Sequence, residues 1–451
     1  VWVSGADAAV ALLQSVVGGG ALTWYFTEIR GMNIDSAAVV WLIFMIWNSI
    51  NDPLFGYISD RTKSKLGRRI PYIRFGAPII ATAFILLFVD FPGTQGQNTA
   101  LFIQFLAGLF IYDTLYTAIA TSIYIMPYEM AVSNKARSSV FIWKILFMTI
   151  STGVPLVVLP MIKPVPGVDD PSSFRWMMVG LGILAGLIVY FSTFFYKEKT
   201  FQQAEEQLPF FKAFVESFKN VPFIIFLVSS FTVIYCQTGL MQGVFYYFDN
   251  VPGVNAMYTY IALGVGIVAG VFFWVNMRER WGVKRCLQIW LFVFSLGCFI
   301  MLLMGKTQIG AILSFLCVGV GFAGGMYLIP IMNGDVIDYD ETRTKLRREG
   351  MYAGINSFVS KPAISLAQAA FLSITASYGY VAGQPTPPEM MDQVSTGILT
   401  GWMLIPGILL AVSFVSMFFY PLFGKKWEQT KKELGMLHEK KERALLAKQG
   451  K

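Results

Sequence analysis

The chain has 451 residues, of which 55% are hydrophobic and only 14% are charged, and its mean hydropathy is +0.58. Soluble domains carry about a quarter charged residues, so this chain has too few charges to cover a water-facing surface. The formal net charge of +8 does not require a nucleic-acid partner, because the basic residues gather in a few loops and in the tail. Composition therefore excludes a soluble enzyme and predicts a polytopic membrane protein.

A helix that spans a membrane needs about 20 mostly apolar residues. The sequence contains twelve such segments, joined by short turns except at the middle of the chain. They lie near residues 5–28, 36–59, 71–90, 99–127, 138–162, 175–196, 222–248, 256–277, 286–304, 309–333, 351–378 and 396–423. We therefore expect an all-α membrane protein with twelve transmembrane helices. Because the sequence begins at Val1, we also expect a short N-terminal tail to precede it.

The central connection, residues 197–221, mixes charges with phenylalanines spaced by three to four residues. This spacing places the rings on one face of an amphipathic helix at the membrane surface. The basic loops 60–69 and 278–285 occupy corresponding positions before and after it, each with a glycine ahead of its last basic residues. Repeated halves of this kind are typical of transporters. The predicted organisation is an N-terminal six-helix bundle (1–196), a cytoplasmic amphipathic linker (197–221), a C-terminal six-helix bundle (222–424) and a basic cytoplasmic tail (425–451).

The distribution of lysine and arginine predicts the orientation of the helices. If the odd-numbered segments run outward, most basic residues fall in the loops and tail on one side. The other side then holds only Arg30, Lys163, Arg175 and Lys306. Cytoplasmic loops carry an excess of lysine and arginine, so both termini are predicted to be cytoplasmic.

The loop after the second segment carries a charged motif, NDPLFGYISDRTKSKLGRR (51–69). Gly56 allows a neighbouring backbone to approach closely. Asp60 ends the helix beside basic residues, with which it can pair, or it can face the N-terminus of an adjacent helix. We predict a cytoplasmic gate motif formed by Gly56, Asp60, Arg61, Gly67, Arg68 and Arg69. The alternative is that these charges only anchor the topology.

The pattern G-x-x-x-D-R…G-R-R in this loop resembles the cytoplasmic signature of the major facilitator superfamily. Residues 47–73 and the block NGDVIDYDETRTKLRREGMYAGINSFVSK (333–361) resemble the glycoside-pentoside-hexuronide:cation symporters, typified by melibiose permease and related to the sodium-dependent lysophospholipid transporters. The resemblance implies the major facilitator fold, with two pseudo-symmetric six-helix bundles that work by alternating access. It does not name the substrate.

Ionisable residues inside a membrane are costly and therefore candidates for function. Asp52 lies about two turns from the inner end of the second segment, and Asn48 lies one turn earlier on the same face. In the resembling symporters, two carboxylates at these positions bind the coupling cation. Asp52 and Asn48 are therefore predicted to form the Na⁺ or H⁺ site, the alternative for Asp52 being a structural ion pair with a lysine.

The resemblance also implies a substrate site. A family lysine falls on Lys361 and a substrate-linked arginine falls on Lys144, although Lys144 lies near enough to the inner surface to extend toward it instead. Asp113, in the middle of the fourth segment, is predicted either to pair with a lysine or to line the cavity alone. The family's sugar-contacting acid falls on Leu12, and its stacking tryptophans fall on Ile123 and Met326, beside Tyr327. We predict Lys144, Lys361, Asp113 and Tyr327 as substrate-binding residues, in a site suited to an anionic or amphipathic solute.

Near the inner end of the tenth segment, four acidic residues are followed by four basic ones: Asp335, Asp338, Asp340 and Glu341, then Arg343, Lys345, Arg347 and Arg348. We predict an inner-gate ion-pair network that includes Asp335, Asp338 and Arg347. A metal site is the weaker alternative, because neighbouring cations would oppose it. No catalytic residues and no metal site are predicted.

These observations predict a multi-pass transporter of the cell membrane that is not an enzyme and has no tightly bound cofactor. No phosphate-binding loop, dinucleotide fingerprint or hydrolase motif occurs in the sequence. The predicted function is cation-coupled symport, with Na⁺ or H⁺, of a glycoside, uronide or other small organic anion, by a protein that works as a monomer in the lipid bilayer. The alternatives are transport of an amphipathic lipid such as a lysophospholipid, and a receptor or scaffold that transports nothing.

Overall fold

The computed structural model of the protein describes residues 2–62, 64, 66–67, 69–130, 143–144, 147–195, 218–344 and 349–448. Within these residues the chain forms helices and no strand. The helices before the central connection are α1 (Trp2–Gly18), α2 (Ala21–Trp24), the π-helix η1 (Tyr25–Ile29), α3 (Ile34–Arg61), α4 (Ile70–Leu87), α5 (Asn98–Met130), the π-helix η2 (Val154–Val158), α7 (Leu159–Ile162) and α8 (Ser172–Ser192). Those after it are α10 (Val221–Asn250), α11 (Ala256–Trp281), α12 (Val283–Met304), α13 (Gln308–Thr344), α14 (Glu349–Ser360), α15 (Pro362–Ser377), α16 (Met391–Ser416), the 3₁₀ turn η3 (Met417–Phe419) and α17 (Gly424–Lys448).

Nine of these helices are long and apolar enough to cross a membrane, counted over the described residues. The α1 helix and the segment 21–29 together form a tenth, bent span. The two remaining predicted segments correspond to the shorter apolar helix Phe147–Ile162 and to α14 and α15. The all-α fold expected from the sequence is therefore confirmed, and each predicted segment corresponds to one or more helices in the described residues, although several helices end a few residues earlier than predicted. The predicted linker lies outside the described residues from 197 to 217.

The first predicted segment is not one continuous helix. The α1 helix ends at Gly18, α2 begins at Ala21, and the two parts of the span are bent by 42°. Gly20 lies between them with φ +97°, a left-handed conformation that costs other residues about 1–2 kcal/mol. The run of three glycines therefore interrupts the helix, which the apolar character of the segment alone does not indicate.

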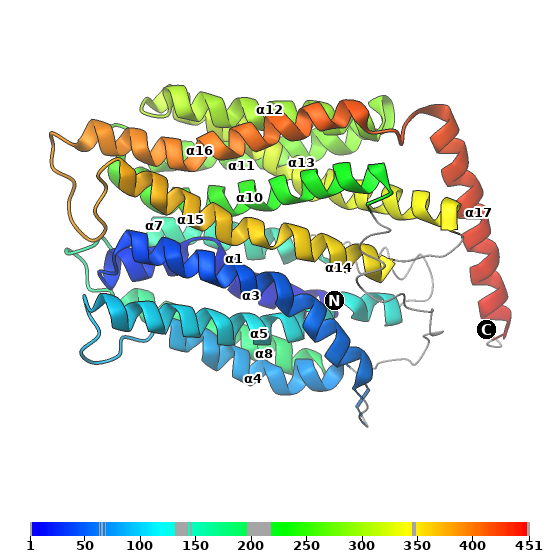
Figure 1. The fold of residues 1–451 in the computed structure, drawn as a ribbon, viewed down its shortest axis with the longest axis horizontal. Helices are drawn as coiled ribbons and strands as arrows, with labels where there is room; N and C mark the ends of the chain where they lie inside the picture. The colour runs from blue at the N-terminus through cyan, green and yellow to red at the C-terminus, as the bar shows by residue number, and fades with distance from the viewer. Residues whose placement is uncertain are drawn as a thin grey trace. The chain divides into compact units, whose positions relative to one another are not determined.

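The chain divides into two compact units. Unit 1 comprises residues 1–203, 234–252 and 361–402. In it, α4 packs on α5 and α8, and α3 packs on α5 and α15 (Figure 1). A Cβ atom placed on Gly186 of α8 would lie 2.7 Å from the Cβ of Ala81 on α4, so this contact depends on small residues.

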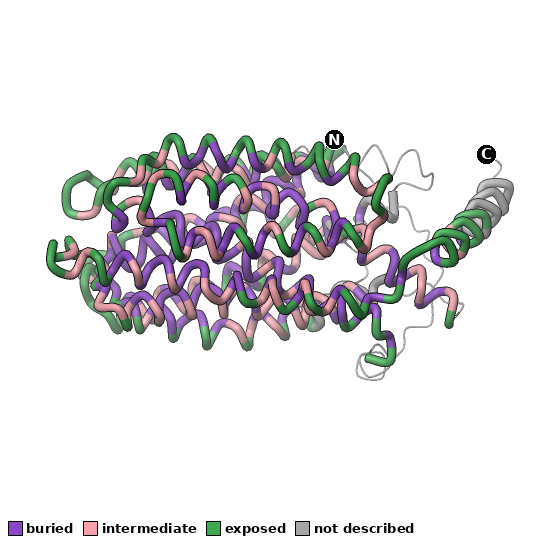
Figure 2. Tube along the Cα trace, turned by 90° about the horizontal axis from the view of Figure 1, so that it is seen from above, coloured by how far each residue is buried: buried purple, intermediate pink, exposed green. Residues whose placement is uncertain are grey.

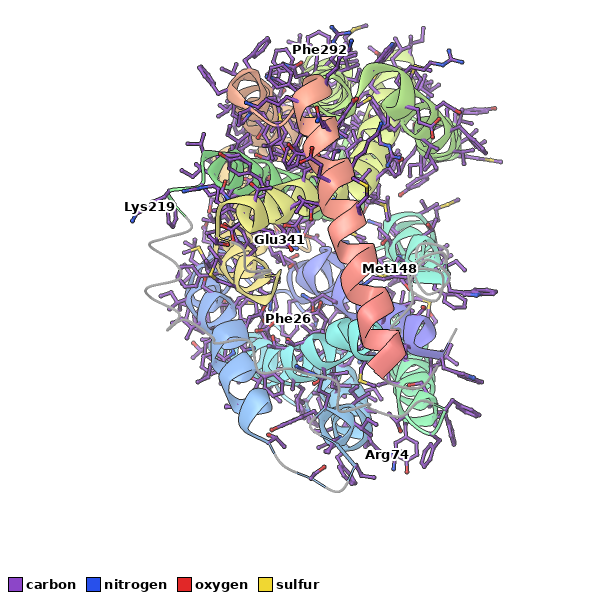
Figure 3. All side chains as sticks on the ribbon, turned by 90° about the vertical axis from the view of Figure 1, so that its right-hand side faces the viewer. Phe26, Arg74, Met148, Lys219, Phe292 and Glu341 are labelled. Atoms are coloured by element: carbon purple, nitrogen blue, oxygen red, sulfur yellow. The ribbon has the colours of Figure 1, made fainter. Side chains whose placement is uncertain are left out.

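Hydrogen bonds from a charged side chain fasten one end of the α4–α8 pair. Arg74 of α4 donates from Nε to Oγ1 of Thr193 (2.9 Å) and from Nη2 to its carbonyl oxygen (3.1 Å). The guanidinium of Arg74, which is labelled in Figure 3, also lies 4.2 Å from the ring centroid of Phe194. Arg74 therefore satisfies a carbonyl that the end of α8 leaves without an intrahelical partner.

Unit 2 comprises residues 204–233, 253–360 and 403–451. Here α13 packs on both α11 and α12 (Figure 1). Glycines allow the close approach, because a Cβ on Gly319 would lie 2.6 Å from the carbonyl oxygen of Leu263. A Cβ on Gly324 would lie 2.1 Å from the indole of Trp290, whose Nε1 donates to the carbonyl of Gly321. Small residues at such contacts are typical of packing between membrane helices.

Large apolar side chains also cover the outward faces of the helices. Phe272 of α11 is 68% exposed and Leu303 of α12 is 82% exposed, while buried residues alternate with exposed ones along each helix (Figure 2). A soluble protein would expose apolar patches on this scale only as interaction surfaces. Lipid is the solvent that such faces fit, in agreement with a multi-pass membrane protein.

The two units do not coincide with the two halves of the sequence, because unit 1 also contains segments that follow the central connection. Residues 234–252 and 361–402 belong to unit 1 together with the first 203 residues. The predicted bundles 1–196 and 222–424 and the predicted tail 425–451 stay predictions. Most of the tail forms α17.

Candidate functional site

A cluster of charged side chains in unit 1 is centred on Asp52 and Lys361. The Lys361 ammonium forms an ion pair with Oδ1 of Asp52, and the two side chains are 16% and 17% exposed. Thr117 of α5 also donates to Oδ1 of Asp52 (3.0 Å), and Lys361 Nζ lies 3.3 Å from the same hydroxyl. Since α3 carries Asp52 and Lys361 directly precedes α15, the pair joins two helices that are about 300 residues apart in the sequence.

A second carboxylate lies within this cluster. Asn51 Nδ2 donates to Oδ2 of Asp113 (2.8 Å) and lies 3.1 Å from the hydroxyl of Thr117. Asn51 and Asp113 are both 2% exposed. The sequence indicated Asp113 but neither Asn51 nor Thr117, although Thr117 lies one turn after Asp113 and Asn51 adjoins Asp52. The direct partner of Asp113 is therefore the amide of Asn51.

Asn48, the other residue predicted for the cation site, is buried beside the same cluster. Its Nδ2 donates to the carbonyl oxygen of Lys361 (3.4 Å). Asn48 thus contacts the backbone at the start of α15, whereas Asp52 contacts the side chain of the same lysine. Both predicted residues therefore face α15.

An aromatic residue that sequence reasoning missed borders the ion pair. Lys361 Nζ lies 5.7 Å from the ring centroid of Tyr116, which stacks on Tyr112 at 6.2 Å. Tyr116 is half-buried and within electrostatic range of Asp7, Asp52 and Asp113. An aromatic face beside two carboxylates and a lysine is suited to a solute that has both apolar and polar faces.

Lys144 is paired elsewhere in unit 1. Its ammonium lies 2.8 Å from Oδ2 of Asp7 on α1, and both side chains are partly exposed. Asp7 was missed because the resemblance placed the family's acid of the first helix on Leu12. Five residues rotate a helix by about 500°, so Asp7 faces a direction about 140° away from Leu12. The first helix therefore does carry a carboxylate, in a different register.

A further buried polar cluster lies at the end of η1. Gly383 donates its N–H to Oε2 of Glu28 (2.9 Å), and the hydroxyls of Thr27 and Tyr246 lie 3.0 Å apart. Nearby, Lys163 forms an ion pair with Asp249. Burial lowers the pKa of Lys163, while Asp249 acts to raise it. These contacts attach the loop that follows α15 to the end of the first span.

The cytoplasmic motif is described in part. The α3 helix ends at Arg61, Gly67 has φ +105°, and Arg69 is buried at the start of α4. The surroundings of Gly56 and the side chains of Asp60, Arg61 and Arg68 lie outside what the structure describes. The left-handed turn at Gly67 explains why glycine stands before the last basic pair.

The predicted inner gate in unit 2 has a partner that the sequence did not suggest. Asp335 of α13 is 5% exposed, and its Oδ1 lies 3.2 Å from Nζ of Lys431 on α17. Trp427 of α17 packs edge-on against Tyr339 of α13. Asp338 also interacts with neighbouring groups. Arg347 lies outside the described residues. The tail helix is thus attached to the predicted gate segment.

Replacing Lys431 with methionine is expected to destabilise the protein, because it leaves Asp335 as a buried carboxylate without its cation. Breaking a buried pair costs about 3–5 kcal/mol, and the partial exposure of Lys431 reduces this to about 1–2 kcal/mol. The double variant Asp335→Asn/Lys431→Met should recover most of the loss in thermal unfolding measurements. A double variant no more stable than Lys431→Met would contradict this account.

Tyr327, predicted to bind substrate, lies on α13 in unit 2 with the Arg278 guanidinium 5.8 Å from its ring centroid. Its role in binding stays a prediction. Within the described part of the chain, no group of three or more histidine, cysteine, aspartate or glutamate residues is placed to hold a metal ion. The oxygen atoms of Asp52, Asp113, Asn51 and Thr117 are instead the kind that bind a monovalent cation or a proton.

Comparison with known proteins places the chain in a family. A family described as "MFS/sugar transport protein" matches residues 5–423. An uncharacterized symporter of Bacillus subtilis is 25% identical, with 92% of this chain and 89% of the relative covered. A glucuronide carrier protein homolog of Escherichia coli (90% and 88% covered) and the isoprimeverose transporter of Lactiplantibacillus pentosus (88% and 83% covered) are each 22% identical.

Solved structures agree on the fold. The inward-open xylose transporter of E. coli superposes with a TM-score of 0.62 at 14% identity, over 95% of this chain and 98% of that one. A nucleoside transporter gives a TM-score of 0.59 at 16% identity, over 93% of this chain and all of that one. The chain therefore belongs to the MFS/sugar transport protein family, in its glycoside-pentoside-hexuronide:cation symporter branch, and is a multi-pass secondary transporter and not an enzyme.

Proposed function

We propose that the protein is a cation-coupled symporter in which Na⁺ or H⁺ binds at Asp52. The observation that carries this proposal is the ion pair between Asp52 and Lys361. A partly buried carboxylate needs a compensating charge, and Lys361 supplies it in this state. A proton or a sodium ion on Asp52 would replace the lysine, so the cation and Lys361 compete for one carboxylate.

The surrounding groups supply the oxygen atoms that such a site needs. Thr117 contacts Asp52, and Asn51 connects Thr117 to the second carboxylate, Asp113. A sodium ion requires several oxygen ligands, whereas a proton requires one carboxylate. We assign Asp113 to this cation cluster, where it adds a carboxylate that Asn48 cannot provide.

Release of Lys361 would make its ammonium available to the solute. Coupling requires that cation and solute favour the same conformation, and an ammonium freed by the cation meets this requirement for a solute with an acceptor or an anionic group. Tyr116 offers an aromatic face beside this lysine, and the Lys144–Asp7 pair offers a second donor and acceptor. Glycosides and uronides combine hydroxyls, a carbon–hydrogen face and, in uronides, a carboxylate.

The names of the relatives favour this substrate class over a lipid. They include a glucuronide carrier homolog, an isoprimeverose transporter and a lactose permease. Transport of an amphipathic lipid remains the second candidate, because the family's sugar-contacting positions hold Leu12, Ile123 and Met326. We further propose that the protein acts as a monomer in the cell membrane, with both termini cytoplasmic.

The test is counterflow in proteoliposomes with labelled methyl glucuronide, methyl xyloside or lysophosphatidylcholine, each with and without sodium at two pH values. We expect exchange of one of the sugars, increased by Na⁺ or by acidic pH, and loss of this cation dependence in Asp52→Asn. Asp170→Asn is the matched control, since Asp170 is exposed and its pKa is held low chiefly by hydrogen bonds from Ser172, with Arg175 also lowering it. Cation dependence that survives in Asp52→Asn would refute the coupling site, and exchange of the lysolipid alone would refute the sugar.

A further inference from the structure

A chain of buried hydrogen bonds holds the break in the first span. Trp41 Nε1 donates to Oγ1 of Thr23 (3.0 Å), and Thr23 donates to Oε1 of Gln368 (3.0 Å). Gln368 Nε2 in turn donates to the carbonyl oxygen of Gly18 (2.7 Å). All four residues belong to unit 1, and each of the three side chains is at most 1% exposed.

The chemistry of the groups fixes the direction of this chain. An indole can only donate, so the hydroxyl of Thr23 accepts from Trp41 and uses its proton on Gln368. Rotating the carboxamide of Gln368 by 180° would place its oxygen against the carbonyl of Gly18, where both atoms are acceptors. Only one orientation therefore satisfies every group.

Gln368 also compensates for a missing backbone partner. The last carbonyls of a helix have no intrahelical donor, and α1 ends at Gly18. An unsatisfied carbonyl at membrane depth costs several kcal/mol. Gln368, from α15, provides the donor that the broken first span lacks.

The same two helices carry the Asp52–Lys361 pair. Gln368 follows Lys361 by seven residues, or about 10 Å along the helix, and the two lie on one face of α15. Trp41 precedes Asp52 by eleven residues, which rotates α3 by three turns and about 20°, so these two residues also share a face. The α3 and α15 helices pack on each other. Their contact therefore has two levels, with the ion pair at one and the hydrogen-bonded chain at the other.

We propose that Gln368 is a positioning residue that couples the state of Asp52 to the break in the first helix. The inference rests on the proposed function, in which a cation on Asp52 releases Lys361. Release lets α15 shift against α3, and this shift changes the spacing between Gln368 and Trp41. Because Thr23 and Gly18 are bonded to these two side chains, the break must move with them or lose its hydrogen bonds.

The test measures hydrogen exchange of residues 16–24 in the full-length protein in nanodiscs, without added solute. Asp52→Asn neutralises the carboxylate and so imitates an occupied site. We expect it to change the exchange rate at the break by about fivefold or more, and to lose this effect when combined with Gln368→Met. Ser365→Ala is the control on α15, because the buried Ser365 hydroxyl has no hydrogen-bond partner in the described part of the chain.

Thr23→Val breaks the same hydrogen-bonded chain at its centre and serves if Gln368→Met does not fold. The proposal would be overturned if Asp52→Asn changed hydrogen exchange at the break equally in the wild type and in Gln368→Met. It would also be overturned if Asp52→Asn changed the exchange in neither of them. The proposed function fails separately, if transport by Asp52→Asn keeps its cation dependence. A merely structural Gln368 would lower the unfolding temperature in Gln368→Met but leave the response to Asp52→Asn unchanged.

Discussion

Replacing Lys361 with methionine is expected to abolish cation-coupled transport and to destabilise the protein by about 2–4 kcal/mol. The methionine keeps most of the volume of the lysine but removes the ammonium that compensates Asp52. The carboxylate then remains beside Tyr116 and close to a second carboxylate, Asp113, without its cation. Thermal unfolding in detergent and solute uptake driven by a cation gradient measure the two effects separately.

A double variant distinguishes loss of the charge pair from loss of packing. Asp52→Asn/Lys361→Met removes the Asp52 charge together with its cation and leaves Asp113 with its Asn51 hydrogen bond, so it should recover most of the lost stability but none of the coupled transport. Lys219→Met, at an exposed lysine, is the matched control and should change neither property. The ion pair would not be the source of the effect if the double variant were as unstable as Lys361→Met.

The helices could be predicted because membrane insertion imposes a local rule. Each spanning helix must satisfy its own backbone and face lipid, so a window of about 20 apolar residues is enough to locate it. The break at Gly18–Gly20 could not be predicted in this way, since glycine is common in membrane helices and the surrounding window stays apolar. The break has a tertiary cause beside the local one, because Gly19 and Gly20 lie against Met241 and Gln242 of α10.

The site could be predicted one residue at a time but not as an arrangement. The cost of burying a charge identified Asp52, Lys361, Asp113 and Lys144 individually. Their partners come from other helices or are neutral, and burial of a neutral side chain gives no comparable signal in the sequence. For this reason Asn51 and Thr117, which connect the two carboxylates, were missed.

The same reasoning applies to the predicted inner gate. The sequence suggested partners for Asp335 within its own segment, where basic residues follow closely. The structure pairs it with Lys431, nearly 100 residues later on α17. A basic tail is typical of a solvated or lipid-facing segment, and only the packing of Trp427 on α13 shows that one face of this helix is buried.

Replacing Gly20 with alanine is expected to destabilise the protein by about 2–5 kcal/mol. Two causes add at this position. The left-handed φ of +97° is unfavourable for alanine, and its Cβ would lie 2.5 Å from the Cα of Gln242 on α10. A backbone atom cannot move aside as the end of a flexible side chain can, so α2 and α10 would have to separate.

Two further glycines isolate these causes. Gly93 has φ +76°, and a Cβ atom on it would meet nothing within 4 Å, so Gly93→Ala should show only the backbone cost of about 1–2 kcal/mol. Gly5 lies within α1 with open space around it, and Gly5→Ala should be neutral or slightly stabilising, since alanine favours helix. If both the backbone conformation and the contact with α10 fix the break, the unfolding temperature should be highest for Gly5→Ala, lower for Gly93→Ala and lowest for Gly20→Ala. If Gly20→Ala and Gly93→Ala lost equal stability, the left-handed backbone would be the only constraint on Gly20. The contact with Gln242 would then contribute nothing, and the first helix could move away from α10.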